Sequence, residues 1–138
     1  MFEFIKKWFA NIGKLSEVLI SELESEGIVL MDEKIRGTIT YRDFHAPGKR
    51  FLYKKSAFTS ALVVTKARLL ATSYANKAIN VPFADERIHS MKFTVEDGKL
   101  CIFFDASLFQ ENWSGHLEFR FNTPNAQRFL DEIQKQLT

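Results

Sequence analysis

The residues with the clearest chemical potential are the basic side chains in the second quarter of the chain. Between residues 34 and 68 the sequence has nine Lys or Arg and a single acid, Asp43, which gives this segment a net charge of +8. The flanking segments are acidic on balance, with −4 for residues 1–33 and −2 for residues 69–138. Charge segregated in this way produces a local positive potential that attracts lipid head groups, nucleic acid or an acidic protein. The charge pattern therefore favours a function in binding an anion.

The other reactive side chains form no catalytic or metal-binding pattern. His45, His89 and His116 are far apart in the sequence, and no cluster of Asp or Glu accompanies them. Cys101 is the single cysteine and stands beside Ile102, which predicts a buried structural thiol rather than a nucleophile. The six glycines are too dispersed to form a phosphate-binding loop. We therefore predict that the protein is not an enzyme and holds no metal and no cofactor.

Nucleic-acid binding is another function that the basic segment suggests. Phe51 and Tyr53 interleave with three basic residues, an arrangement similar to the stacking platforms of single-strand-binding proteins. The whole chain, however, has a net charge of only +2, and two thirds of it is acidic on balance. We do not expect nucleic acid to be a partner.

A hairpin at the centre of the chain organises the predicted fold. Residues 61–64 and 69–72 are two runs of mostly apolar residues on either side of the short hinge at residues 65–68. The β-branched residues of these runs favour strands. A hinge this short is typical of two antiparallel strands rather than of a helix.

Further strands are indicated on both sides of this hairpin. Apolar and polar residues alternate over 35–42, 91–96 and 117–122, and the dipeptides Pro47-Gly48 and Asp97-Gly98 mark turns. The chain therefore has about seven short strands. We predict an antiparallel sheet that curls into a barrel.

Helices are predicted at both ends of the chain. Thr123-Pro124 should cap and open a final amphipathic helix that covers one open end of the barrel. Residues 14–26 have a helical apolar stripe, with Ser16 as a cap and Gly27 as a stop. The acidic side chains of this helix are expected to form a solvated face: Glu22, Glu24 and Glu26.

The first twelve residues predict a further, amphipathic helix. Its apolar arc includes the bulky residues Phe2, Ile5, Trp8 and Phe9. Such a helix can lie in a membrane interface with its aromatic rings inward, or it can pack on the domain or on a second subunit. These four residues are therefore candidates for membrane or partner contact.

The motifs resemble those of the pleckstrin-homology-like (PH-like) superfamily. Residues 62–70 are similar to the "V-T-x-x-R-L" strand pair of GRAM and bacterial PH-like domains, and residues 79–83 are similar to the "I-x-I-P" segment that follows it. The resemblance assigns residues 1–26 to an N-terminal helical extension and residues 27–138 to a PH-like (GRAM-like) domain. It implies a mostly β (α+β) fold, a curled antiparallel barrel of about seven strands with a C-terminal capping helix. Phe129 departs from the pattern, because eukaryotic PH domains usually have Trp in the closing helix.

The resemblance also implies which residues bind a ligand. Members that bind phosphoinositides use basic residues on the first strand pair and its connecting loop. The matching residues here are Arg42, Lys49, Arg50, Lys54 and Lys55. They could make charge-assisted contacts to the phosphate oxygens of an anionic head group. The alternative is a solvated sheet face, with Arg68 paired to an acid such as Asp85 or Glu86.

Protein association is the alternative function. Bulky apolar residues crowd the segment 103–113, and not all of them can point into one small barrel. Those left outside, with Phe109 and Trp113 as candidates, would mark a surface for a protein partner or for a homo-oligomer. Such a module would need no lipid.

The sequence shows neither a secretory signal nor a membrane-spanning segment. No stretch approaches the ~20 apolar residues that cross a bilayer, and a lone cysteine fits a reducing compartment. We therefore expect a cytoplasmic protein that can associate with the inner face of a membrane. The function predicted is a non-enzymatic binding module, a peripheral-membrane adaptor for anionic lipid, with protein–protein interaction as the alternative.

Overall fold

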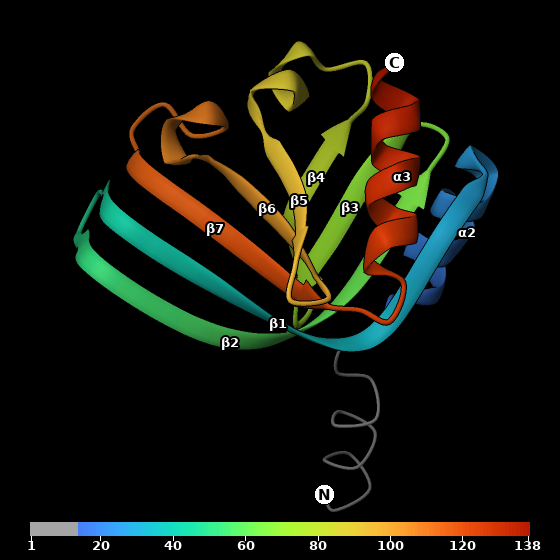
Figure 1. The fold of residues 1–138 in the computed structure, drawn as a ribbon, viewed down its shortest axis with the longest axis horizontal. Coiled ribbons are helices and arrows are strands. Elements are labelled where there is room, and N and C mark those ends of the chain that lie inside the picture. Colours follow the sequence, from blue (N-terminus) through green and yellow to red (C-terminus); the bar gives the residue numbers. More distant parts are fainter. Residues whose placement is uncertain (1–13) are drawn as a thin grey trace, which may run out of the picture.

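The computed structural model describes residues 14–138, which form one curled antiparallel sheet with two helices (Figure 1). The strands are β1 (Ile28–Ala46), β2 (Lys49–Thr65), β3 (Arg68–Ser73), β4 (Asn76–Pro82), β5 (Lys92–Glu96), β6 (Lys99–Asp105) and β7 (Ser114–Asn122). The helices are α2 (Glu17–Glu26) and α3 (Ala126–Leu137), and 3₁₀ turns span Glu86–Ser90 (η1) and Ala106–Leu108 (η2). The mostly β fold, the seven strands and the C-terminal helix predicted from the sequence are confirmed.

The strand order of the sheet is β4-β3-β2-β1-β7-β6-β5. Every neighbouring pair is antiparallel, and β1 joins the two halves by pairing with both β2 and β7. β4 and β5 are the two edges and do not pair with each other, so the sheet curls without closing (Figure 1). A closed barrel is therefore not confirmed.

β1 and β2 form a hairpin that is much longer than the short strands expected. β1 has 19 residues and β2 has 17, and they meet at the predicted Pro47-Gly48 turn. β7 pairs with β1 from Arg36 to His45 and so supports the distal half of the hairpin. A Cβ on Gly115 of β7 would lie 2.4 Å from the Asp43 carbonyl oxygen, and its φ is +100°, so this position needs glycine. The distal part of the hairpin thus belongs to a three-stranded stretch of sheet, in which β2 lies on one side of β1 and β7 on the other.

The central hairpin predicted from the two apolar runs is confirmed. Val63 pairs with Leu70 and Val64 with Leu69 across the β2–β3 turn, and all four side chains are fully buried. Val64 and Leu69 belong to the main core with α3, whereas Val63 and Leu70 pack with Leu23 of α2. Burial on both faces explains why these runs do not alternate with polar residues.

A polar cluster joins the start of α3 to β1. The Thr123 hydroxyl donates a hydrogen bond to Asp32, and the Asn125 side-chain amide donates to both oxygens of the same carboxylate at 3.2 Å. The Thr123 hydroxyl also accepts a hydrogen bond from the Asn125 backbone amide at 3.1 Å, so it caps the turn that leads into the helix, as predicted. The helix itself begins at Ala126, two residues after Pro124, and the Asn125 side chain at its N-cap position makes no capping bond. Thr123 thus both caps this turn and fixes the loop before α3 to β1.

Arg68 of β3 holds α2 on the sheet. Its Nε donates to Glu26 Oε1 at 3.0 Å, and its Nη2 lies 2.8 Å from Glu26 Oε2 and 3.1 Å from Glu22 Oε1. The predicted pairing of Arg68 with Asp85 or Glu86 is therefore wrong. Glu22 and Glu24 are exposed, as predicted, although Glu22 also pairs with Arg68. Glu26 is only 21% exposed and binds the sheet instead.

Candidate functional site

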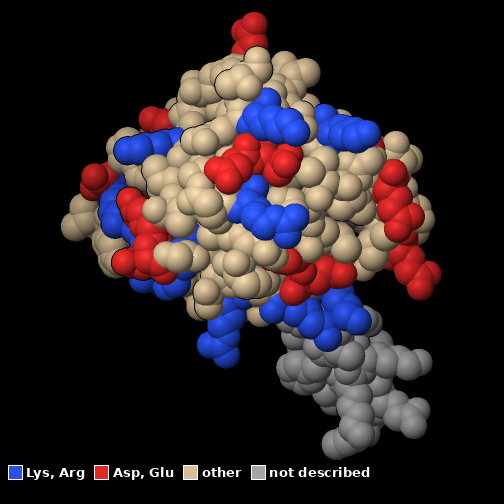
Figure 2. All heavy atoms as spheres, turned by 45° about the vertical axis from the view of Figure 1, so that its right-hand side comes forward, with Lys and Arg blue, Asp and Glu red and all other residues tan. Residues whose placement is uncertain are grey.

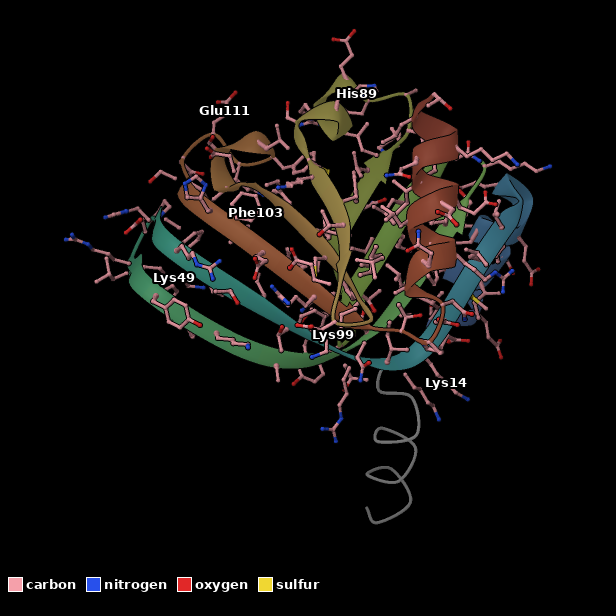
Figure 3. The ribbon with its side chains drawn as sticks, in the orientation of Figure 1. Lys14, Lys49, His89, Lys99, Phe103 and Glu111 are labelled. Carbon is pink, nitrogen blue, oxygen red and sulfur yellow. The ribbon has the colours of Figure 1, made fainter. Side chains whose placement is uncertain are left out.

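The basic arm, residues 42–55, is the distal part of the β1–β2 hairpin. It has five basic side chains and one acid, Asp43, for a net charge of +4. Lys49 lies at its far end, away from α2 and α3 (Figure 3). The structure thus brings the predicted ligand-binding set onto one hairpin: Arg42, Lys49, Arg50, Lys54 and Lys55.

Four of the five basic side chains in the arm have no acidic partner within residues 14–138. They are Lys49, Arg50, Lys54 and Lys55, and all four are solvent-exposed. Arg42 differs, because its Nη1 lies 3.6 Å from Glu118 Oε1 and its guanidinium lies 5.9 Å from the centre of the Tyr53 ring. The free positive charge of the arm therefore comes from Lys49 and Arg50 beside the turn and from Lys54 and Lys55 farther along β2.

These charges occupy both faces of the arm. Lys54 and Lys55 are consecutive in β2, so their side chains point to opposite faces of the sheet. The Lys54 ammonium lies 4.5 Å from the centre of the Phe51 ring, while Lys55 stands opposite Thr40 on β1. Positive charge is therefore present on both faces of this part of the sheet.

Two large apolar side chains are exposed between the basic residues of the arm. Leu52 is 81% exposed and Tyr53 is 61% exposed, whereas the neighbouring Phe51 packs against Tyr41 and Phe44. Sequence reasoning missed Leu52. The sequence does carry a signal for it. Leu52 is the middle of three consecutive apolar residues, Phe51 to Tyr53, which have two basic residues on each side. The hairpin has too few buried positions for all three side chains.

The face of the molecule that carries the helices has a different charge pattern. Figure 2, which turns the α3 side forward, shows blue and red side chains interspersed on that face. Outside the arm, the pairs of Arg68 with Glu26 and of Arg87 with Asp85 likewise bring opposite charges together. A face with both signs produces little net field, so the arm is the better candidate for an anion.

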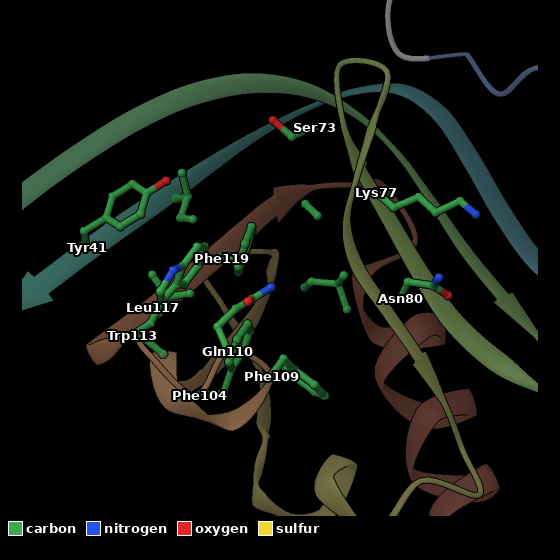
Figure 4. Close-up of a pocket in the computed structure, with 14 residues that line it drawn as sticks. Tyr41, Ser73, Lys77, Asn80, Phe104, Phe109, Gln110, Trp113, Leu117 and Phe119 are labelled. Carbon is green, nitrogen blue, oxygen red and sulfur yellow. The ribbon is translucent and has the colours of Figure 1, made fainter. Parts of the chain in front are cut away.

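The aromatic residues predicted to contact a partner are half-buried rather than protruding. Phe109 packs edge-on against Phe104 at 5.7 Å, and Trp113 packs edge-on against Phe44 at 5.3 Å between ring centres. Both line a cavity of about 440 Å³ (Figure 4). The remaining predicted contact residues, Phe2, Ile5, Trp8 and Phe9, lie outside the described residues.

The reactive side chains are placed as follows. Cys101 is buried in β6, and this burial raises the pKa of its thiol, which disfavours the reactive thiolate. Among residues 14–138, no three His, Cys, Asp or Glu side chains come together in a way that could hold a metal ion. The same part of the chain has no helix of the length and apolar character needed to cross a membrane.

Comparison with known proteins assigns no family to this chain. No protein-family model matches it, and no curated protein matches its sequence. The geometry of the basic arm therefore carries the functional assignment.

Proposed function

We propose that this protein is a non-enzymatic PH-like binding module that attaches reversibly to anionic membrane surfaces through the basic arm. The observation that carries the proposal is the exposure of Leu52 and Tyr53 among four basic side chains without acidic partners in the described chain. Basic groups approach lipid phosphates and carboxylates, while the two apolar side chains enter the interface. The mostly β architecture with a C-terminal helix is also what the PH-like resemblance implies.

The strength of this attachment follows from the same residues. Each Lys or Arg near an anionic leaflet contributes about 1 kcal/mol, and full burial of one leucine side chain contributes about 1.5–3 kcal/mol. Part of this gain offsets the lost freedom of the bound protein. The result is weak, salt-sensitive binding, as expected of a peripheral adaptor at the anionic inner face of a membrane.

Vesicle co-sedimentation tests the proposal. The protein should sediment with vesicles that contain phosphatidylserine, much less with pure phosphatidylcholine vesicles, and less at high salt. The double reversal Lys49→Glu/Arg50→Glu should abolish sedimentation. The matched control Lys92→Glu/Lys99→Glu changes the same charge at exposed positions on β5 and β6, outside the arm, and should reduce binding much less.

Two results would overturn the proposal. One is the absence of sedimentation under every condition, and the other is an equal loss in the two double variants. Protein association is the alternative in the first case, and light scattering would then report whether the chain forms homo-oligomers. Protein association has less support than membrane binding, because Phe109 and Trp113 are half-buried whereas the charged side chains of the arm are exposed.

A further inference from the structure

A cavity of about 440 Å³ opens between the β3–β4 hairpin and the loop that precedes β7 (Figure 4). Much of its wall is made of apolar side chains, among them Ile39, Ile79, Phe104, Leu117 and Phe119. Its volume is within the range of small-molecule sites, ~300–1,000 Å³. Water against such walls finds few hydrogen-bond partners, so an apolar group that displaces it is stabilised.

Hydrogen-bond donors stand around this apolar wall. The side chains of Tyr41, Gln110 and Trp113 line the cavity, and their polar groups make no hydrogen bond to another side chain within residues 14–138. In Figure 4 the Tyr41 hydroxyl and the Gln110 amide both point towards the space between the labelled side chains. A tyrosine hydroxyl is protonated at neutral pH and can donate, and burial raises the pKa of the Tyr41 phenol further.

The charge at the cavity has a single sign. Lys77 is the one charged residue that lines it in the described chain, and neither Asp nor Glu does. Its aliphatic stem is at the rim and its ammonium extends away from the aromatic rings (Figure 4). A ligand with an anionic head at this rim would therefore meet donors and a cation but no repelling carboxylate.

We propose that the cavity binds an apolar monocarboxylate, of which a fatty acid is the simplest example. Its hydrocarbon body lies along the apolar wall, and its carboxylate stays at the rim beside Lys77. This inference does not rest on the membrane-binding proposal, because none of the residues that line the cavity belongs to the exposed basic tip of the arm.

Titration calorimetry of the full chain with decanoate tests this site. We expect one decanoate to bind per protein molecule. Ala78→Leu adds a larger side chain at the cavity wall and should weaken binding roughly tenfold or more. The control Ala57→Leu makes the same addition at an exposed position of β2 outside the cavity and should leave the affinity unchanged.

The rim is tested separately with Lys77→Glu, an exposed substitution that should not affect folding. It should weaken decanoate binding roughly tenfold and should leave the binding of decanol, which has no charge, nearly unchanged. Equal effects on the two probes would contradict the carboxylate assignment.

A second readout does not depend on substitution in the cavity. The chain has two tryptophans, so Trp8→Phe leaves Trp113 as the single reporter in the cavity wall. Its emission should change as decanoate is added, with the same midpoint as the calorimetric titration. Absence of both heat and emission change, or equal affinity of Ala78→Leu and Ala57→Leu, would overturn the proposal.

Discussion

Arg68→Met removes the guanidinium that ties α2 to β3 but keeps a long apolar side chain. The Arg68 side chain is only 11% exposed and that of Glu26 is 21% exposed. After the substitution, the Glu26 carboxylate would keep one side-chain donor, the Thr65 hydroxyl at 3.0 Å. The half-buried Glu26 carboxylate would thus lose its cationic partner. The ion pair that holds α2 over the contact between Leu23 and Val63 would also be lost.

The expected loss of stability lies between two limits. Breaking a buried ion pair by removing one partner costs about 3–5 kcal/mol, whereas an exposed pair contributes about 0–1 kcal/mol. Glu26 is close to the buried limit, but Glu22 is 55% exposed and contributes little. We therefore expect the free energy of unfolding to fall by about 2–3 kcal/mol, which lowers Tm by roughly 8–12 °C in a domain of this size.

Urea unfolding followed by circular dichroism measures this loss. Arg87→Met is the matched control, because it removes an arginine from an exposed pair with Asp85 and should change stability little. The double variant Arg68→Met/Glu26→Met should regain part of the loss, because it also removes the half-buried carboxylate, and Glu22, which still loses its arginine, is 55% exposed. If Arg68→Met is no less stable than Arg87→Met, or if the double variant regains nothing, then the Arg68–Glu26 pair does not hold α2 on the sheet.

Three further predictions concern single positions. Gly37→Ala should lower the free energy of unfolding by about 1–3 kcal/mol, because its Cβ would lie 2.7 Å from a ring carbon of buried Phe58. Gly48→Ala has open space around its Cβ, so it should lower the free energy of unfolding by only ~1 kcal/mol, the cost of an alanine at a φ of +74°. Urea unfolding compares the two. The buried Cys101 thiol, with its raised pKa, should react with a thiol reagent at neutral pH only as the protein unfolds; rapid reaction of the native protein would contradict its placement. Leu52→Ala should leave the unfolding curve unchanged and weaken anionic-vesicle binding roughly tenfold in a sedimentation titration, whereas an unchanged affinity would exclude Leu52 from the interface.

The parts of the fold that depend on local chemistry could be predicted from the sequence. Ser16 caps α2 by accepting a hydrogen bond from the Leu19 amide at 3.2 Å, and Gly27 ends that helix with a φ of +87°. Pro47-Gly48 and Asp97-Gly98 both form hairpin turns. These residues act on neighbours a few positions away, so their types alone are informative.

Contacts between distant parts of the chain could not be predicted in the same way. Arg68 and Glu26 are 42 residues apart, and Thr123 and Asp32 are 91 residues apart. Any of several carboxylates could have reached Arg68, and only the packing of α2 on the β2–β3 hairpin decides which one does. Whether the sheet closes into a barrel likewise depends on the distance between its edge strands, β4 and β5, and the residue types of these strands do not reveal that distance.

The candidate site was predictable in its charge but not in its apolar part. The basic residues of the arm were found because like charges cluster along a short stretch. Leu52 was missed because an apolar residue in a strand is ordinarily assigned to the core. Its exposure follows from the long hairpin, where Phe51 already packs on Tyr41 and Phe44.

An environment-sensitive dye on the arm tests the central proposal most directly. Leu52→Cys in a Cys101→Ser background provides one exposed thiol for labelling, and Lys99→Cys in the same background places the dye on the β5–β6 hairpin as a control. We expect phosphatidylserine vesicles to shift the emission of the Leu52 dye to the blue, high salt to reverse the shift, and the Lys99 dye not to respond. An unshifted Leu52 dye on a vesicle-bound protein would show that another surface makes the contact and would exclude the basic arm as the membrane site.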